Sequence, residues 1–196
     1  RRQRQMCIRD SINVRNLPEE EFDMPLGEAT GAGHIFGATG GVMEAALRSA
    51  HFLVTGENPD PDAFSAVRGC EGWREVTYNL AGKELTVAIV SGLQNADNLC
   101  NAIENGEVDY DFVEVMACPG GCVGGGGQPI LDGIDLNVYR GAALWKIDRD
   151  MDIRFSHENP DILDLYRLYL GKPMSEKAHH LLHTDHHAWK MPRHMV

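Results

Sequence analysis

The chain has 196 residues, of which 43% are hydrophobic and 24% are charged, and its formal net charge is −11. A chain of this length can bury one substantial core, so we expect one domain or a domain with a small appendage. The negative charge argues against a nucleic-acid partner, and no apolar run approaches the ~20 residues of a membrane span. Five cysteines, an odd count without a secretion signal, argue against a disulfide scaffold. These features predict a cytoplasmic globular protein whose thiols are reduced or bind metal.

The first eleven residues, RRQRQMCIRDS, differ in composition from the rest of the chain. Four of the eighteen Lys and Arg residues fall in this segment beside one acidic residue, and no amphipathic period would dock it on a domain. The segment is similar to translated adapter sequence joined to an open reading frame, and a basic tail is the alternative. We interpret residues 1–11, Cys7 included, as foreign and leave them out of fold reasoning.

The chain from residue 12 onward alternates loops, helices and strands. Residues 17–33 are acidic and rich in turn formers, which is typical of a loop. Apolar residues recur at helical spacing through residues 40–56, where Gly56 is a stop signal. Strand, helix and strand in succession indicate a right-handed βαβ unit, so the expected fold class is α/β with parallel packing. The expected elements are strands at 74–80 and 84–91 around an Ala-Gly-Lys turn, a helix at 95–106 and a buried strand at 112–116.

The pattern becomes helical after Pro129. Asn159 followed by Pro160 is typical of a helix start, and Ser175 is a cap for the helix that follows it. We expect residues 135–184 to form helices that pack on the α/β lobe. Their apolar contacts are expected to come from Leu163, Leu165, Tyr166 and Leu170.

The stretch EVMACPGGCVGGGGQP, residues 114–129, joins a strand end to a turn with Cys118 and Cys122 and then to four consecutive glycines. A backbone without Cβ atoms costs conformational entropy, and close approach to a bulky group is the usual reason for it. A structural zinc site usually has a second cysteine pair, and a thioredoxin-like pair has two intervening residues rather than three. Iron–sulfur ligation fits best, because thiolates hold the cluster and backbone N–H groups reach its sulfurs. A glycine loop with incidental thiols is the alternative.

This stretch resembles the third signature loop of the [FeFe]-hydrogenases, the iron-only hydrogen-activating enzymes. Two further blocks, PLGEATGAGHIFGATGGVMEAALR and SHENPDILDLYRLYLGKPMSEKAHHLLHT, resemble segments of the same family in the same order, so the similarity runs from about Asn16 to Thr184. The resemblance implies that residues 12–130 form one lobe of a two-lobed, parallel-sheet α/β domain. Residues 131–190 would then be a helical tail like the family's small subunit.

The resemblance also assigns roles to individual residues. Cys118 matches a ligand of the 4Fe-4S cubane of the active-site H-cluster, and Cys122 matches the thiolate that bridges this cubane to a two-iron subsite. Met116 and Phe36 match residues packed around the two-iron subsite, and Gly37 matches one whose backbone approaches it. For Met116, ordinary core packing at a strand end is an equally good interpretation.

The family takes two further cluster cysteines from two earlier loops, and nothing between Ile12 and Cys118 matches either loop. The resemblance therefore implies the C-terminal part of a longer enzyme, truncated at its N-terminus and inactive alone, because a four-iron cluster usually needs four cysteines. The parent enzyme would interconvert protons and molecular hydrogen. Its partners would be the missing N-terminal lobe and a ferredoxin or an NAD(P)H-linked electron-transfer subunit. The alternatives are a cluster-assembly or lamina-associated relative without hydrogenase activity and a hydrogen-sensing homologue.

Other residues with metal-binding chemistry favour structural interpretations. His179 and His183 lie four residues apart on a predicted helix, but solvated histidines near a chain end are the favoured interpretation, as they are for His186 and His187. Cys70 and Cys100 are expected to be buried or half-buried thiols without a chemical role. The glycines of residues 37–41 are expected to serve a turn and close helix packing, because no strand and no Gly-Lys-Ser/Thr accompany them as in a phosphate loop.

Overall fold

The computed structural model describes residues 11–13, 16–21, 23, 27, 29–131 and 134–184. Most of the segment interpreted as foreign, with Cys7, lies outside these residues, as do His186 and His187. The elements in chain order are α2 (Gly31–Ile35), α3 (Gly41–Thr55), η2 (Ser65–Val67), β1 (Trp73–Leu80), β2 (Lys83–Ser91), α4 (Leu93–Glu104), β3 (Phe112–Met116), η3 (Cys122–Gly124), α5 (Asn137–Asp150), η4 (Ser156–Glu158), α6 (Pro160–Leu165), the π-helix η5 (Tyr166–Leu170) and α7 (Glu176–Leu182).

The sheet has three strands in the order β1-β2-β3, and it is mixed. β1 and β2 form an antiparallel hairpin, whose turn residues Ala81 and Gly82 both have positive φ, as the tight turns of twisted hairpins require. β2 and β3 pair in parallel, with α4 as the connection between them. The α/β class and the expected elements are confirmed, and among the described residues parallel pairing is confined to β2 and β3.

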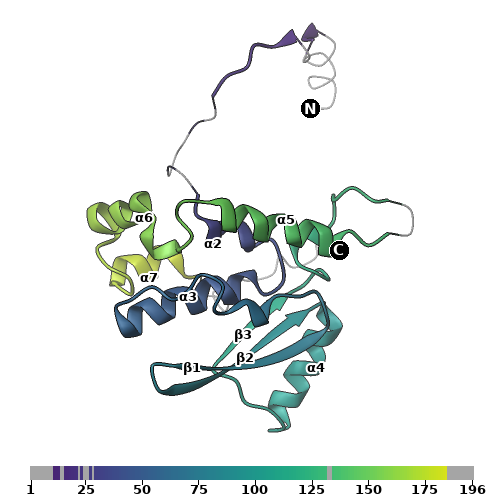
Figure 1. Cartoon of the computed structure of the whole chain (residues 1–196), viewed down its shortest axis with the longest axis vertical. Coiled ribbons are helices and arrows are strands. Elements are labelled where there is room, and N and C mark those ends of the chain that lie inside the picture. The colour runs from purple at the N-terminus through teal and green to yellow at the C-terminus, as the bar shows by residue number, and fades with distance from the viewer. Residues whose placement is uncertain are drawn as a thin grey trace, which may run out of the picture.

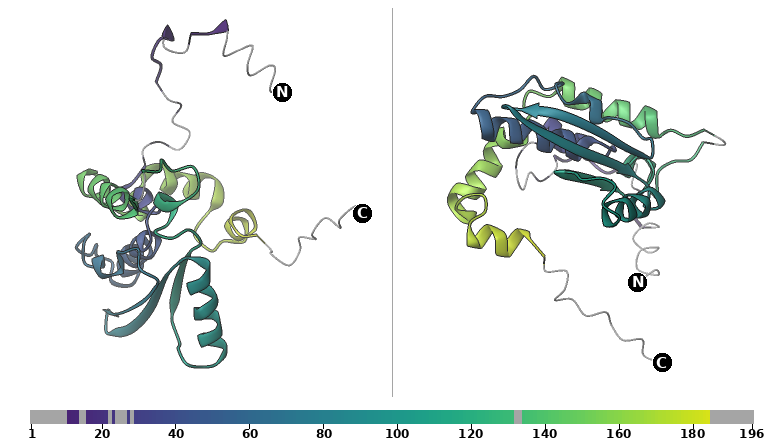
Figure 2. Two further views of the ribbon diagram at one scale, coloured as in Figure 1. Left: turned by 90° about the vertical axis from the view of Figure 1, so that its right-hand side faces the viewer. Right: turned by 90° about the horizontal axis from the view of Figure 1, so that it is seen from below.

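The sheet is covered by a helix on each face. α3 lies over one face and α4 over the other (Figures 1 and 2). The side chains of residues 87–90 in β2 are all fully buried, although neighbouring residues of a strand point to opposite faces. β2 is therefore the central strand of a helix–sheet–helix sandwich. The core cluster on the α3 side consists of Met43, Leu47, Phe64, Val67, Leu80, Val87 and Ile89.

β3 differs from the fully buried strand that its apolar sequence predicts. Phe112 is 44% exposed and Val115 is 50% exposed, whereas the buried residue of this strand is Glu114. Within the described residues β3 pairs only with β2, so one side of it lies open. The apolar residues made the strand recognisable, but they did not indicate which of its side chains is buried.

The C-terminal helices begin where the sequence predicts. Asn159 accepts hydrogen bonds from the N–H groups of Asp161 and Ile162, and Ser175 accepts one from Ala178, so both caps are confirmed. α5 packs against α2 in one apolar cluster, which consists of Ala32, Ile35, Ala45 and Trp145. The boundary at residues 130 and 131 stays a prediction. No helix in the described part of the chain is long and apolar enough to span a membrane.

Apolar burial differs among the expected contact residues of the tail. Leu170 is 4% exposed and Leu165 and Tyr166 are half-buried, but Leu163 is 53% exposed, so Leu163 is less buried than the other three. Leu163 and Leu170 are seven residues apart and would share one face of a regular α-helix. The π-helix η5, closed by a bond from the Gly171 N–H to the Tyr166 carbonyl, changes this register.

A buried ion cluster links α3 to α5. Arg48 forms a two-pronged pair with Asp148, at 2.9 Å for each oxygen, and also contacts Glu44 at 2.7 Å. All three side chains are fully buried. Arg68 and Arg154 contact the outer sides of Glu44 and Asp148 at 2.7 and 2.6 Å. Burial alone would raise the pKa of Asp148, but the hydrogen bonds from Arg48 and Arg154 outweigh it and hold this pKa below its usual value.

This cluster generates a prediction about stability. Arg48→Met removes the central cation and leaves two buried carboxylates with incomplete pairing, so we expect the free energy of unfolding to fall by about 3–5 kcal/mol. Arg167→Met is the matched control, because Arg167 is 70% exposed and pairs with an exposed Asp164. The control should change stability by no more than ~0.5 kcal/mol. Urea unfolding measures the stability of both variants. If Arg48→Met and Arg167→Met unfold at the same urea concentration, the cluster has no structural role.

The tail generates a second prediction, which compares two leucines. Leu170→Ala should lower the free energy of unfolding by about 2–5 kcal/mol, because it creates a cavity at a buried site. Leu163→Ala should change it by less than ~0.5 kcal/mol, because this side chain is half exposed. Thermal unfolding of the two variants tests whether η5 is docked on the rest of the fold. If both variants have the melting temperature of the unsubstituted chain, η5 is not docked.

Candidate functional site

The loop with Cys118 and Cys122 follows β3 at the carboxyl end of the parallel pair. Ser91 and Met116, the last residues of β2 and β3, lie side by side in the register of the sheet. In α/β folds this edge is where ligands usually bind, because the loops that leave parallel strands converge there. Both thiols are exposed, and neither is in a disulfide. The site is therefore formed by strand ends and the loops that follow them.

The loop has a defined internal conformation. The Gly121 N–H donates to the Cys118 carbonyl at 2.9 Å, and the Gly125 N–H donates to the Cys122 carbonyl at 3.0 Å. Gly120 and Gly121 have φ values of 82° and 91°, in the left-handed region that favours glycine. A Cβ at Gly121 would also lie 2.8 Å from the Gly37 carbonyl oxygen. The two glycines between the cysteines thus bring the loop into close contact with the segment around Gly37.

That segment, residues 37–40 between α2 and α3, is called the strap here. The Val123 N–H donates to the Gly37 carbonyl at 3.0 Å, and the Thr39 N–H donates to the Gly120 carbonyl at 3.1 Å. On the sheet side the Gly120 N–H donates to Ser91 Oγ at 2.8 Å in a buried bond. The cysteine loop is therefore held by peptide and side-chain hydrogen bonds on two sides.

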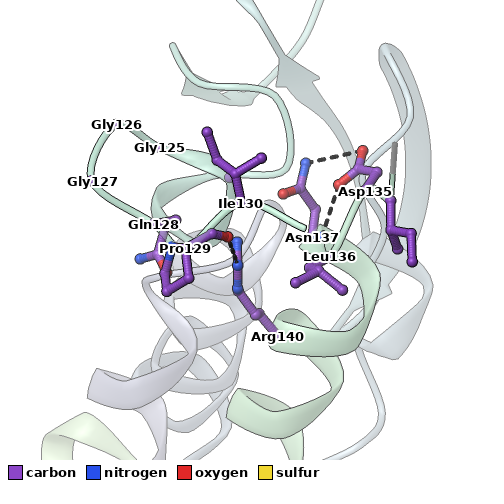
Figure 3. Close-up of a pocket in the computed structure, with 12 residues that line it drawn as sticks. Gly125, Gly126, Gly127, Gln128, Pro129, Ile130, Asp135, Leu136, Asn137 and Arg140 are labelled. Atoms are coloured by element: carbon purple, nitrogen blue, oxygen red, sulfur yellow. Dashed lines mark hydrogen bonds between the residues drawn. The ribbon is translucent and has the colours of Figure 1, made fainter. Parts of the chain in front are cut away.

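The start of α5 holds the loop on a third side. Asn137 Nδ2 donates to the Pro119 carbonyl at 3.1 Å, and Arg140 donates to the carbonyls of Val123, at 3.0 Å, and Pro129. Figure 3 shows these side chains beside the glycine run, where they line a cavity of about 280 Å³. The loop is thus held by the strap, by Ser91 at the end of β2 and by the first turn of α5.

Glu114 is a site residue that the sequence analysis did not single out. It lies two residues before Met116 on β3, and its side chain is directed away from solvent. Its carboxylate oxygens accept the N–H groups of Gly40 and Met43, each at 2.6 Å. Burial raises the pKa of Glu114, and the two N–H bonds partly oppose this rise. A lone acidic residue in an otherwise apolar strand was the available signal.

The structure places the other expected site residues around this loop. Gly37 bonds Val123 through its carbonyl, Phe36 precedes it with 45% of its surface exposed, and Met116 ends β3 half-buried. A Cβ at Gly40, where φ is 90°, would lie 2.1 Å from the Val67 carbonyl oxygen, so this glycine serves a turn and close packing as expected. What Phe36, Gly37 and Met116 do towards a metal group stays a prediction.

The chemistry of the loop fits part of an iron–sulfur ligand set. Two exposed thiols lie on one short turn, and a Cβ at Gly126 or Gly127 would meet no heavy atom within 4 Å, so the glycine run leaves open space. Within the described residues no group of three or more His, Cys, Asp or Glu is placed to hold a metal ion. The described part of the chain therefore has two exposed thiols at this loop that could hold a cluster, and a four-iron cluster usually needs four.

Of the other cysteines that the structure describes, Cys70 lines a cavity together with Ala38 and Thr39 of the strap, and Cys100 lies on α4. Cys70 is half-buried, and burial raises the pKa of its thiol. Cys100 is exposed, which corrects the expectation of a buried or half-buried thiol: the neighbouring Leu99 occupies the buried face of α4. His179 and His183 stack with ring centroids 4.7 Å apart, and both are exposed, as expected for solvated histidines.

Comparison with known proteins gives two family matches along the chain. The family described as "Iron only hydrogenase large subunit, C-terminal domain" matches residues 3–126, and the family "Iron hydrogenase small subunit" matches residues 135–189. The first match begins inside the segment that we interpret as foreign, and that interpretation stays a prediction.

Two curated relatives and one solved structure illustrate the similarity. The NADP-reducing hydrogenase subunit HndD of Solidesulfovibrio fructosivorans is 47% identical over 91% of this chain and 30% of its own length. Cytosolic iron-sulfur assembly component 3 of Rattus norvegicus is 34% identical over 79% of this chain and 32% of its own length. An apo [FeFe]-hydrogenase structure from Chlamydomonas reinhardtii superimposes with a TM-score of 0.67 at 41% identity, over 92% of this chain and 52% of that one.

The chain thus spans about a third of these curated relatives and about half of the solved hydrogenase chain. The first family match covers more than half of the residues of this chain, and the second match covers most of the helical tail. The sequence resemblance and the fold agree with these matches. The chain belongs to the iron-only hydrogenase family, and it contains a match to the C-terminal domain of the large subunit followed by a match to the small subunit.

Proposed function

We propose that the chain forms part of an iron-only hydrogenase that interconverts protons and molecular hydrogen at an H-cluster. The observation that carries this proposal is the cysteine loop. Cys118 and Cys122 are exposed at the carboxyl end of the parallel strands, on a turn fixed by the strap, by Ser91 and by the start of α5. A thiolate pair held in this way suits a rigid metal cofactor, because the loop need not be ordered when the cofactor binds.

The residues of the loop have distinct roles in this proposal. Cys118 would hold the 4Fe-4S cubane of the cluster, and Cys122 would be the thiolate shared with the two-iron subsite. When bound, the cluster supplies the two-electron chemistry, and the protein holds, encloses and tunes it. Met116 and Phe36 are apolar and lie on two of the segments around the loop, where they would exclude water from the subsite. The backbone of Gly37 would lie against the subsite beside them.

The proposal includes partners because two thiolates are half of the usual ligand set. The other two would come from an N-terminal lobe of the same enzyme, which is our proposed partner for the face with the cysteine loop. Electrons would pass to a ferredoxin or an NAD(P)H-linked subunit. The relative HndD is named as a subunit of an NADP-reducing hydrogenase, which supports the second of these. The cytoplasmic location stays a prediction.

A second candidate function is cluster assembly without hydrogenase activity. The similarity to cytosolic iron-sulfur assembly component 3 favours it, and the cysteine loop would serve an ordinary iron–sulfur cluster equally well. The higher identity to HndD, 47% against 34%, favours the hydrogenase. A hydrogen-sensing homologue is the third alternative. Hydrogen turnover distinguishes the first two, since only the hydrogenase carries the two-iron subsite.

The test replaces four cysteines, one at a time, in the chain joined to the preceding part of HndD and matured anaerobically. Cys122→Ala should abolish hydrogen evolution and the infrared bands of the diatomic iron ligands, because the bridge to the two-iron subsite is lost. Cys118→Ala should lower the iron content of the cubane. Cys70→Ala and Cys100→Ala are the controls and should change neither. The 196-residue chain alone should show no hydrogen evolution.

Infrared spectra, iron counts and dye-linked hydrogen assays measure these outcomes. Normal turnover in Cys122→Ala would contradict the hydrogenase proposal. An iron–sulfur signal without diatomic bands in the unsubstituted protein would favour the assembly candidate instead. A loss in Cys70→Ala as large as that in Cys122→Ala would show that the wrong thiols have been chosen.

A further inference from the structure

We infer that Glu114 is the positioning residue of the cysteine loop: its buried carboxylate fixes the strap, and the strap fixes Cys118 and Cys122 for the group that they bind. The inference deepens the proposed function and rests on it only in naming that group. The contacts that join Glu114, the strap and the cysteine loop are all between residues of this chain.

The first step is the cap that Glu114 supplies to α3. The first N–H groups of a helix have no partner within the helix, and a Ser, Thr, Asp or Asn at the N-cap usually accepts one of them. Here the N-cap is Gly40, which has no side chain. Glu114 replaces the missing cap from a strand about seventy residues away in sequence, and each of its oxygens accepts one N–H, from Gly40 and from Met43. The positive end of the helix dipole favours a carboxylate at this place.

The second step is a closed ring of bonds. From Glu114 the chain runs along β3 through Cys118 to Gly120. The Gly120 carbonyl accepts the Thr39 N–H at 3.1 Å, Thr39 is bonded to Gly40, and the Gly40 N–H returns to Glu114 at 2.6 Å. Cys118 is one of the residues that form this ring, between Glu114 and Gly120. A change at Glu114 is therefore transmitted to the cysteine loop through the covalent chain on one side and the strap on the other.

The third step extends the ring to the second thiol. Gly37, in the same strap, accepts the N–H of Val123, which is the residue after Cys122. The strap thus contacts the loop twice, at Gly120 between the two cysteines and at Val123 directly after Cys122. Glu114 holds the end of the strap opposite to Gly37, at Gly40. Losing the carboxylate should loosen both attachments together, so both thiols should be affected.

Two substitutions of Glu114 separate its chemistry from its bulk. Glu114→Gln keeps the size but replaces one acceptor oxygen with an NH₂ group, which would face a backbone N–H and leave a buried donor without a partner. Glu114→Asp keeps the carboxylate but is shorter by one CH₂ group, so we expect it to reach only one of the two N–H groups. Glu84→Gln is the matched control, because Glu84 is an exposed glutamate on β2.

The test measures cadmium binding to the full chain without a cluster, in which Cys7, Cys70 and Cys100 have been replaced by serine. Cadmium–thiolate absorbance reports the Cys118 and Cys122 pair. We expect Glu114→Gln to weaken cadmium binding by about tenfold or more, a change of ~1.4 kcal/mol, because a loosened pair must be ordered on binding. Glu114→Asp should lie between this variant and the unsubstituted chain, and Glu84→Gln should bind as the unsubstituted chain does.

Each outcome decides the inference. If Glu114→Gln lowers the melting temperature but binds cadmium as before, Glu114 only stabilises α3 and the inference is wrong. If Glu114→Gln does not fold, Glu114→Asp decides in the same way. Because the assay contains no iron and no hydrogen, a failure here leaves the proposed function standing. A failure of the hydrogen assay with weakened cadmium binding leaves the positioning role standing.

Discussion

The candidate site depends on one set of constraints, the hydrogen bonds that join the strap to the cysteine loop. A loop with two left-handed glycines and a further glycine run has high conformational entropy when it is free. The hydrogen bonds at Gly37 and Thr39, with the one to Ser91 on the sheet side, fix the backbone of this loop. The glycines themselves have no side chain that could do so. The positions of the two thiols follow from this arrangement. Without it, Cys118 and Cys122 would be an exposed pair with no fixed relative position.

The larger fold explains why the strap can do this. The strap is short and lies between α2 and α3, so its position is set by how those helices pack. α3 is held on the sheet by the apolar cluster around Met43 and Leu47, and it is held to α5 by the fully buried pair of Arg48 and Asp148. α5 in turn places Asn137 and Arg140 beside the loop. Core, ion cluster and site thus share the same helices.

The sequence predicts well what depends on local patterns. α3, the hairpin, α4 and the caps at Asn159 and Ser175 each have a periodicity, a turn pair or a cap residue within a few positions. The two cysteines were identified from their spacing and their glycine neighbours, and the family followed from three blocks of residues. These features need no knowledge of the tertiary structure.

Two of the features that the sequence did not predict depend on a partner distant in the chain. Glu114 looks like an ordinary polar residue in a strand until the N-terminus of α3 is placed over it. Arg48 and Asp148 are a hundred residues apart, and each alone resembles a solvated charge. The other two are local: the π-helix η5 interrupts the regular helical spacing between Leu163 and Leu170, and Leu99 rather than Cys100 occupies the buried face of α4.

The central claim is that the cysteine loop is already ordered in the chain without a cofactor. Amide hydrogen exchange followed by nuclear magnetic resonance tests it most directly, at the N–H groups of Thr39, Gly120 and Val123. If the strap holds the loop, these amides should exchange about a hundredfold or more slowly than the amide of the exposed Gly126. If all four exchange at the same rate, the loop is not preformed and the account of the site is wrong.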